Sequence, residues 1–400
     1  MTAKRARPDL AIRDRRVSKR VQRFPESVIR EMTRIAALHD AVNLAQGYPD
    51  FDPPAEVLEA AKDALDAGHN QYSITWGAPA LRDAIARKAK AFNGIDADPE
   101  ANVVVTCGST EAMMAAMLSL VDPGDEVVVL EPFYENYGPD AIVSGARPRY
   151  VRLEWPSWRL DEEALKAAFT TRTKAVILNT PNNPTGKVFS RDELRLVADL
   201  CVDRDAIAVA DEIYEHITYD GTRHVSIATL GDMPDRTITI NGISKTYSAT
   251  GWRVGWALGP KTLVDAMRRT HDFLTVGAPH PLQVAAVAAL ALPPTYYEGL
   301  ASMYAAKRDA FVRALQAVGL RCEPPQGAYY VMTDVSAFPF PDDWAFAMYL
   351  VERLRVAVVP GSSFYGRPED GRRFVRFIFS KKDETLHEAI DRLSGLRDIR

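Results

Sequence analysis

The middle of the chain alternates short apolar runs with stretches of mixed, helix-like polarity. The apolar runs are rich in valine, isoleucine, leucine and alanine, and they occupy residues 103–106, 126–130, 174–179, 206–211 and 237–241. Near-continuous runs of this length predict strands that are buried on both faces, as in parallel sheets. Between the third and fourth runs, Ser190 and Glu193 fit a capping box, which predicts a helix to about Val202. We therefore expect an α/β fold with a mostly parallel sheet flanked by helices.

The two ends of the chain show a different pattern. Residues 24–45 predict one amphipathic helix, and residues 298–318 predict a long one. Alternating strands are expected at 328–333 and 374–379. The predicted organisation is a basic N-terminal arm (1–23), a large domain (49–294) and a smaller α+β domain built from both ends (24–48 and 295–400).

Composition narrows the class of protein. The 400 residues carry 49 Lys and Arg against 53 Asp and Glu, a net charge of −4, and such a balance argues against nucleic acid as the main partner. The arm alone carries +7 and leaves −11 on the rest, which is typical of a solvated basic arm on an acidic body. The longest apolar run, 284–292, is far shorter than the ~20 residues of a membrane span, so no membrane partner is expected.

Cysteine and histidine spacing gives two further expectations. The three cysteines (Cys107, Cys201, Cys322) form no C-x-x-C pair, and no apolar segment follows Arg15 and Arg16. We therefore expect a cytoplasmic protein without a secretory signal or a disulfide framework. The seven histidines show no metal-ligand spacing, so no metal is predicted.

Polar and small residues follow four of the predicted strands. The segments are 107–112, 180–186, 211–214 and 241–253, and in an open α/β sheet such segments meet where ligands bind. The first is a small-residue turn that opens a helix, which suits a phosphate group. The others supply Lys245, Asp211, Tyr214, Asn183 and Arg253. A lysine for a Schiff base, an acid for a ring nitrogen and an anion site are the needs of pyridoxal phosphate (PLP), which we therefore expect as cofactor.

These segments also resemble a known family. Residues 244–255, Ser-Lys-Thr-Tyr-Ser-Ala-Thr-Gly-Trp-Arg-Val-Gly, are similar to the PLP-attachment segment of class I/II aminotransferases. Asn183-Pro-Thr-Gly186 and Asp211-Glu-Ile-Tyr214 match the other signatures of that family. The resemblance covers about residues 43–393 and implies the fold of the type I PLP-dependent transferases.

The resemblance implies a role for each matching residue. Lys245 would form the Schiff base and then shift the proton, Asp211 would pair with the ring nitrogen, and Tyr214 and Asn183 would hydrogen-bond the phenolic oxygen. The phosphate would be bound by Arg253 and the turn, with Ser244 as a less well-supported helper; the turn residues are Gly108, Ser109 and Thr110. Asp211 as a helix cap and Asn183 as a turn residue are the structural alternatives.

Further roles concern the ring face, the partner subunit and the substrate. Tyr134 would stack on the cofactor ring, although Phe133 and Tyr137 are also aromatic and Tyr134 could be an ordinary core residue. Tyr72 would reach the phosphate of a partner subunit, which implies a homodimer. Arg376 would bind the substrate α-carboxylate, with Asn183 and, on the opposite wall, Gly47; a structural ion pair is the alternative for Arg376.

The implied reaction is a ping-pong transfer of an amino group between an L-amino acid and a 2-oxo acid. Residues 131–134, 179–190 and 326–329 are most similar to the kynurenine, glutamine and methionine branch, which implies aromatic, sulfur-containing or neutral side chains. An aspartate-type enzyme is the alternative if Arg268, Arg269 or His271 binds a distal carboxylate. A cysteine-conjugate or C–S β-lyase, or another biosynthetic PLP enzyme, would use the same residues. A DNA-binding regulator is not expected, because only about twenty residues precede the shared region and a DNA-binding module needs roughly 60.

Overall fold

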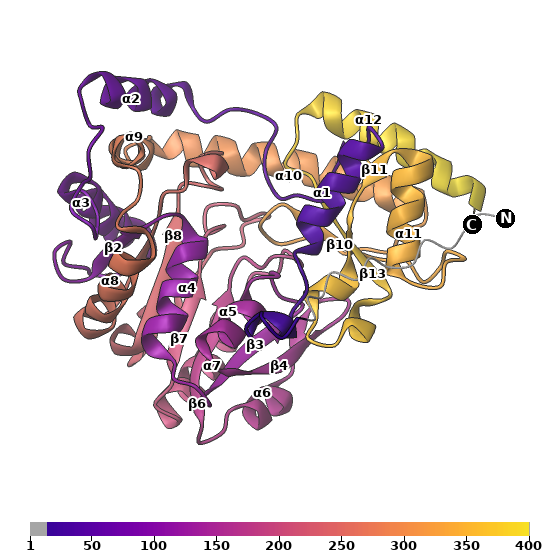
Figure 1. Cartoon of the computed structure of the whole chain (residues 1–400). Helices are drawn as coiled ribbons and strands as arrows, with labels where there is room; N and C mark the ends of the chain where they lie inside the picture. Colours follow the sequence, from indigo (N-terminus) through magenta and orange to yellow (C-terminus); the bar gives the residue numbers. More distant parts are fainter. Residues whose placement is uncertain (1–13, 400) are drawn as a thin grey trace. The chain divides into compact units, whose positions relative to one another are not determined.

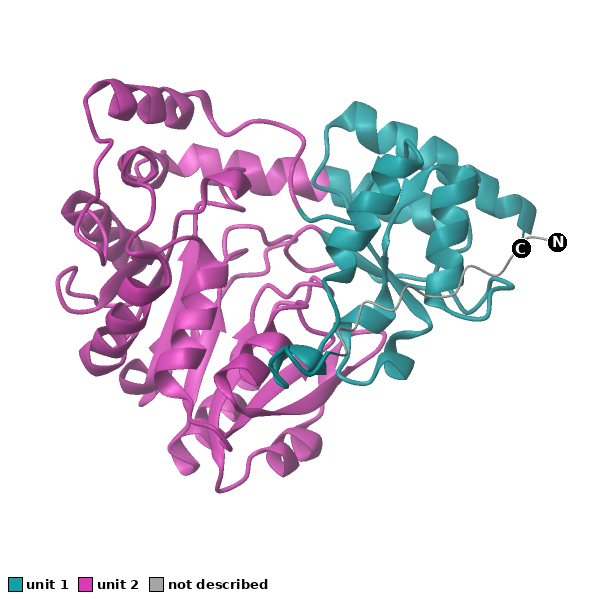
Figure 2. Cartoon of the chain, viewed as in Figure 1, with its two compact units in different colours: residues 1–47, 307–324, 330–400 teal, residues 48–306, 325–329 magenta. Residues whose placement is uncertain are grey.

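The computed structural model describes residues 14–399, so positions 1–13 of the expected basic arm lie outside the described residues. Two compact units divide the chain (Figure 2). Unit 1 contains residues 14–47, 307–324 and 330–399, and unit 2 contains 48–306 and 325–329. These ranges differ from those expected from the sequence at 48, 295–306 and 325–329, which belong to unit 2. The reason is local: the boundary falls inside one helix, α10 (Pro294–Ala317), and the amide of Gly327 bonds the carbonyl of Gly186 at 2.8 Å.

Unit 2 is built on an eight-stranded sheet with the strand order β2-β9-β8-β7-β6-β3-β4-β5 (Figure 1). The central strands β8, β7, β6, β3 and β4 run parallel, while β9 is antiparallel to both its neighbours and β5 is antiparallel to β4. The strands are β2 (Val103–Thr106), β3 (Glu126–Glu131), β4 (Arg147–Glu154), β5 (Arg159–Leu160), β6 (Thr173–Asn179), β7 (Ile207–Asp211), β8 (Thr237–Gly242) and β9 (Gly255–Leu258). The α/β class and the five strands expected in the middle of the chain are confirmed.

Helices cover both faces of this sheet. Its alternating side chains divide between two apolar clusters, one with Val104 and Ala257 and the other with Val105 and Trp256. The first cluster includes buried residues of α4 (Ser109–Leu120), α5 (Tyr137–Ser144) and α8 (Lys261–Thr275), and the second includes residues of α2 (Ala55–Asp66), α3 (Pro79–Lys88) and α9 (His280–Leu290). Two further helices of unit 2 are α6 (Glu162–Ala168) and α7 (Arg191–Asp203). In α7 both bonds of the capping box between Ser190 and Glu193 are present, as expected.

Unit 1 contains a three-stranded antiparallel sheet and a separate two-stranded parallel pair. Its elements are α1 (Val28–Leu38), β1 (Val42–Asn43), β10 (Tyr330–Asp334), α11 (Asp343–Tyr349), β11 (Val356–Ala357), β12 (Val359–Pro360), β13 (Phe374–Ile378) and α12 (Asp383–Leu393). The helix expected over 24–45 is shorter than predicted. Asp40 takes the left-handed conformation at φ 49°, and Val42 then pairs with the carbonyl of Arg355, so the chain leaves the helix after Leu38.

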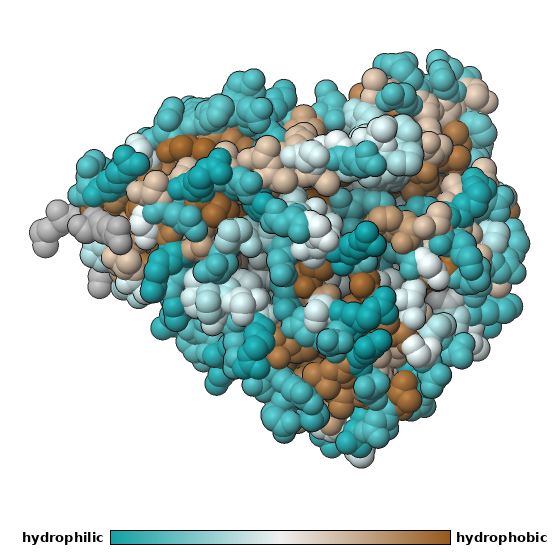
Figure 3. Space-filling view, turned by 180° about the vertical axis from the view of Figure 1, so that it is seen from behind, coloured by the Kyte–Doolittle hydropathy of each residue, from teal (hydrophilic) through white to brown (hydrophobic). Residues whose placement is uncertain are grey.

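The face of the protein in Figure 3 is mostly hydrophilic, with separate apolar patches between hydrophilic side chains. Among residues 14–399, no helix combines the length and the apolar character needed to cross a membrane.

Candidate active site

The expected site residues of unit 2 follow strands whose carboxyl ends share one edge of the sheet. β2, β6, β7 and β8 point the same way, because β9 is antiparallel to both β2 and β8. The turns after these four strands therefore emerge together. This topology brings the segments beginning at Cys107, Thr180, Glu212 and Ile243 to one end of the unit.

Asp211 ends β7 and is 7% exposed. Its Oδ2 accepts a hydrogen bond from the hydroxyl of Tyr137 at 2.8 Å, and its Oδ1 accepts one from the amide of Ile213 at 3.2 Å. Burial raises the pKa of Asp211 to about 6, against these bonds and the positive charge of Lys245, which act to lower it. The carboxylate is thus held in place by hydrogen bonds, but nearby positive charge does not offset its burial. A cationic ring nitrogen would supply such a charge.

Lys245 and Tyr214 lie near this carboxylate. Lys245 follows β8 and is partly exposed, and its Nζ lies 5.9 Å from the centroid of the Tyr214 ring. Tyr214 is 3% exposed and packs edge-on against Tyr329, with ring centroids 5.4 Å apart. The amine of Lys245 and the phenol ring of Tyr214 therefore lie close together.

Asn183 is fixed by a residue that the sequence analysis did not single out. The side-chain amide of Asn179 donates to the carbonyl of Asp211 at 2.9 Å, and its oxygen accepts from the amide of Asn183 at 2.7 Å. Asn179 thus ties the loop after β6 to the end of β7. The sequence feature that could have indicated this role is that Asn179 is a polar residue at the end of a buried strand.

The turn after β2 and Arg253 are in direct contact. Gly108 precedes α4 with φ 82°, and a Cβ there would lie 2.3 Å from Nη2 of Arg253. Arg253 donates to the carbonyl of Thr250 at 3.0 Å. A Cβ on Gly255 would lie 2.5 Å from the amide nitrogen of Ser109. Glycine is therefore required at both positions for the guanidinium and β9 to approach the turn. Ser109 and Thr110 open the first turn of α4, where backbone amides lack intrahelical partners.

Ser244 has a buried hydroxyl beside the lysine. The residue is 4% exposed, and among the described residues its Oγ has no hydrogen-bond partner. A buried hydroxyl of this kind calls for an acceptor that the protein itself does not supply.

The aromatic residues after β3 divide their roles. Tyr134 is partly exposed and lies edge-on to Tyr137 at 5.7 Å, whereas Phe133 is 5% exposed and stacks on Tyr150. Phe133 therefore belongs to the core, and Tyr134 remains the candidate for the ring face. Tyr137 was weighed only as an alternative stacking residue, but its hydroxyl binds Asp211.

The remaining expected residues lie elsewhere. Tyr72 is in unit 2 and is 83% exposed. Gly47 and Arg376 belong to unit 1, where a Cβ on Gly47 would lie 2.3 Å from the hydroxyl of Tyr330. Arg376 is fully buried, donates to the carbonyl of Ala45, and lies 4.6 Å from the ring centroid of Tyr330.

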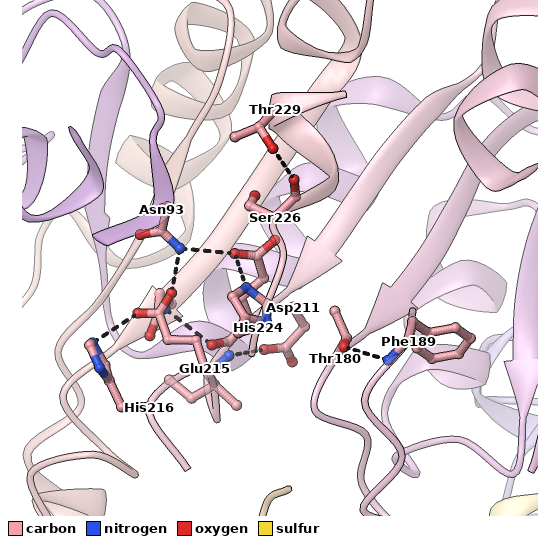
Figure 4. Close-up of polar contacts among 12 residues, drawn as sticks. Asn93, Thr180, Phe189, Asp211, Glu215, His216, His224, Ser226 and Thr229 are labelled. Carbon is pink, nitrogen blue, oxygen red and sulfur yellow. Dashed lines mark hydrogen bonds and ion pairs between the residues drawn. The ribbon is translucent and has the colours of Figure 1, made fainter. Parts of the chain in front are cut away.

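A buried charged cluster begins at Glu212, the residue that follows Asp211 (Figure 4). Glu212 bonds His224 at 2.9 Å, Asn93 donates to Glu215 at 2.6 Å, and Lys88 forms an ion pair with Glu215. Burial opposes ionisation of Glu215, but Lys88, the two histidines His216 and His224 and the Asn93 bond together outweigh it and lower the pKa to about 2. Glu212, Glu215 and His224 offer ligand atoms within 4.8 Å of one another. Lys88 already pairs with Glu215, so we assign the cluster no metal, although Oε1 of Glu212 and Nδ1 of His224 have no hydrogen-bond partner among the described residues.

The arrangement of unit 2 is that of an α/β fold whose lysine, buried acid and phosphate-sized turn at the carboxyl end of the sheet suit an anionic, lysine-linked cofactor. The chain matches the family of class I and II aminotransferases over residues 39–393. The solved N-succinyldiaminopimelate aminotransferase of Mycobacterium tuberculosis is 39% identical, with a TM-score of 0.93 over 95% of this chain and 100% of that one. Kynurenine–oxoglutarate transaminase 1 of Homo sapiens is 38% identical over 91% of this chain and 94% of its own. The solved YbdL of Escherichia coli, described as a methionine aminotransferase, is 33% identical, with a TM-score of 0.90 over 96% of this chain and 99% of that one.

This protein belongs to the class I and II aminotransferase family, and it is a PLP-dependent aminotransferase of fold type I. Its substrates are therefore an amino acid and a 2-oxo acid. The residues present fit the cofactor: the lone buried hydroxyl of Ser244, the Gly108 turn that a Cβ would fill, and the buried Asp211 meet three separate needs of PLP.

Proposed function

We propose that this aminotransferase prefers L-amino acids with aromatic, sulfur-containing or neutral side chains over dicarboxylic ones. This preference rests on residues 268–271, which contain the three candidates for binding a distal carboxylate: Arg268, Arg269 and His271. Arg268 donates to the backbone carbonyls of Glu100 and Val103, each at 2.7 Å, and His271 is fully buried between Glu111 and Thr75. Both side chains are committed within unit 2, which leaves Arg269 as the exposed cation of the segment.

The site residues would divide the work as follows. Lys245 Nζ would hold the cofactor, take the proton from the substrate Cα and return it during the transfer. Asp211 would keep the ring nitrogen protonated, and Tyr214 and Asn183 would hold the phenolic oxygen. PLP supplies an electron sink for the negative charge that develops at the substrate Cα.

Binding of the phosphate, the ring face and the substrate falls to other residues. The amides of the turn after β2, with Arg253 and Ser244, would bind the phosphate, and Tyr134 would cover the ring. Arg376 would bind the substrate carboxylate, and Gly47 and Asn183 are the other residues expected to bind the substrate. The Arg376 guanidinium is fully buried and lies over the rings of Tyr330 and Phe364, which supports this assignment, because a pair with a carboxylate is strong in such an apolar setting.

The substrate proposal is tested by half-reactions with single amino acids. The purified enzyme is mixed with kynurenine, phenylalanine, methionine, glutamine or aspartate, and the loss of the visible absorbance of the lysine-bound cofactor is timed. We expect kcat/KM for the best aromatic or sulfur-containing donor to exceed that for aspartate at least tenfold. A faster reaction with aspartate would establish the aspartate-type alternative. Release of pyruvate from a cysteine conjugate, without a half-reaction, would establish the β-lyase.

We further propose a homodimer in which Tyr72 reaches the phosphate of the partner subunit. Tyr72 is accompanied by exposed apolar side chains: Ile74 (42%), Phe273 (92%), Leu274 (44%) and Val276 (43%). The two segments adjoin, since Nε2 of His271, two residues before Phe273, lies 2.8 Å from the carbonyl oxygen of Thr75. Exposed apolar residues gathered in this way are typical of an interface. Light scattering should give twice the chain mass, and Phe273→Glu should give the mass of a single chain.

The three cysteines are free thiols, which supports a cytoplasmic location. Fractionation of the cells that express the protein would test it.

A further inference from the structure

His271 of α8 is a fully buried histidine whose two ring nitrogens both face oxygen acceptors. Nδ1 lies 2.6 Å from Oε1 of Glu111, and Nε2 lies 2.8 Å from the carbonyl oxygen of Thr75. A backbone carbonyl can only accept, so Nε2 carries a proton. A carboxylate also accepts, so the arrangement fits a ring with both nitrogens protonated.

Glu111 joins this histidine to the turn after β2. It lies in the first turn of α4, and its other oxygen accepts from the backbone amide of Cys107, just before Gly108. Thr275 donates to the same carboxylate at 2.9 Å. The charge on Glu111 therefore sits beside the amides and the Arg253 guanidinium that would bind the cofactor phosphate.

A carboxylate in that position is an electrostatic problem. A phosphate at the start of α4 carries about two negative charges, and an unpaired carboxylate in the same turn would repel it. The imidazolium of His271 removes this repulsion by pairing with Glu111. The other nearby groups are Asp272, Cys107 and Arg253. Burial of His271 opposes its charge, but Glu111, the Thr75 carbonyl and Asp272 outweigh that effect and raise its pKa.

The second contact of His271 reaches the segment that carries Tyr72. Gln283 fastens the same segment, accepting from the amide of Ala78 at 2.8 Å and donating to Ser73 at 2.9 Å. The segment 73–78 is thus held both by Gln283 of α9 and by His271. One side chain connects the phosphate turn with the segment expected to meet the partner subunit.

We propose that His271 is a positioning residue for the cofactor phosphate, acting as the counter-charge of Glu111 and as the tie between the turn after β2 and residues 70–78. The proposal rests on the phosphate role assigned above to that turn. It concerns binding of the phosphate and not the chemistry at the substrate Cα.

The test compares two ligands that differ only in the phosphate. The apoenzyme is titrated with PLP and with pyridoxal, and the ratio of the two dissociation constants reports the contribution of the phosphate. In His271→Gln we expect PLP to bind about tenfold more weakly and pyridoxal to bind within twofold of the wild type. His280→Gln is the matched control, because His280 contacts the same segment through Gln71 without a carboxylate partner; its ratio should not change.

Rescue separates charge from simple structure. The double variant Glu111→Gln/His271→Gln removes both charges, so it should recover most of the lost PLP affinity, and Glu111→Gln alone should not weaken PLP binding. The ratio of the pyridoxal to the PLP dissociation constant of the wild type should fall as the pH rises through the raised pKa of His271, because a group with a raised pKa contributes below that pKa and not above it. The ratio for His271→Gln should stay flat.

Several results would overturn the proposal. They are equal losses of PLP and pyridoxal in His271→Gln, the same loss of PLP binding in Glu111→Gln, or a double variant no better than His271→Gln. If His271→Gln fails to fold, Glu111→Gln and the wild-type pH profile decide the question. A wild-type protein that binds pyridoxal as tightly as PLP would instead refute the phosphate turn, and with it the proposed cofactor site.

Discussion

Removing the hydroxyl of Tyr137 should destabilise the apoenzyme at alkaline pH and much less at acidic pH. This hydroxyl donates at 2.8 Å to a carboxylate, Asp211, whose pKa burial raises from 3.8 to about 6. Roughly two pKa units correspond to about 3 kcal/mol. Ionisation of Asp211 therefore lowers the free energy of unfolding of the apoenzyme, and the hydrogen bond from Tyr137 makes this loss smaller.

The sign of the pH dependence follows from the raised pKa. A carboxyl group with a raised folded-state pKa favours the folded state below its unfolded pKa, and this contribution is lost as the pH rises through the folded value. A hydrogen bond to a charged group contributes about 1.5–3 kcal/mol. Tyr137→Phe should therefore raise the pKa of Asp211 by about one to two units and cost about 1.5–3 kcal/mol at pH ~8.5 but about 1 kcal/mol or less at pH ~5.

The assay is urea unfolding of the apoenzyme at these two pH values, followed by fluorescence. Tyr296→Phe is the matched control, because its hydroxyl donates at 2.7 Å to the backbone carbonyl of Thr246, which does not titrate. Its loss of stability should be the same at both pH values. An equal loss for Tyr137→Phe at pH ~5 and pH ~8.5 would refute the reasoning, because the hydroxyl would then not serve the ionised carboxylate.

Three further variants test other parts of the structure. Lys245→Ala should lack the visible absorbance of the lysine-bound cofactor and show no half-reaction; normal turnover would exclude Lys245 as the linking residue. Gly108→Ala places a Cβ at 2.3 Å from Nη2 of Arg253, in a left-handed conformation. It should weaken PLP binding about tenfold or more in equilibrium dialysis while pyridoxal binding changes little. Burial of Asp334 acts to raise its pKa, but its bonds with Ser336 and Arg373 outweigh burial and lower it. Because its stabilising charge is lost as the pH falls through that lowered pKa, Asp334→Asn should lower the melting temperature at pH 7, and the difference should shrink in acid.

The sequence predicted those elements whose signal is local. The strands 103–106 and 206–211 and the capping box at Ser190 depend on neighbouring residues, and the structure agrees with them. The end of the first helix was predicted wrongly, because the partner that draws Val42 into a strand is Arg355, more than 300 positions away. A pattern along the chain carries no information on such a pairing.

The same distinction applies to the site. Segments at strand ends were recognisable as motifs, and the parallel strands place them at one edge. The residues that support them were not recognisable. Tyr137 reaches Asp211 across 74 positions, and His271 reaches Glu111 across 160. His271 was considered instead as a substrate cation, and full burial between two acceptors argues against that role.

The Asp-Glu pair at the end of β7 shows why supporting residues matter for the chemistry. Successive side chains of a strand point to opposite sides, so Asp211 meets Tyr137 while Glu212 meets Asn93 and His224. The negative charge of Glu212 acts to raise the pKa of Asp211, and the hydrogen bonds of His224 and Asn93 hold that charge on the far side. An ion pair between Asp211 and a cationic side chain of the protein would have neutralised the Asp211 carboxylate. Because its own donors are a phenol and a backbone amide, Asp211 keeps a carboxylate that a protonated ring nitrogen can still neutralise, and in the proposed site this negative charge would be the contribution of the sheet edge to PLP binding.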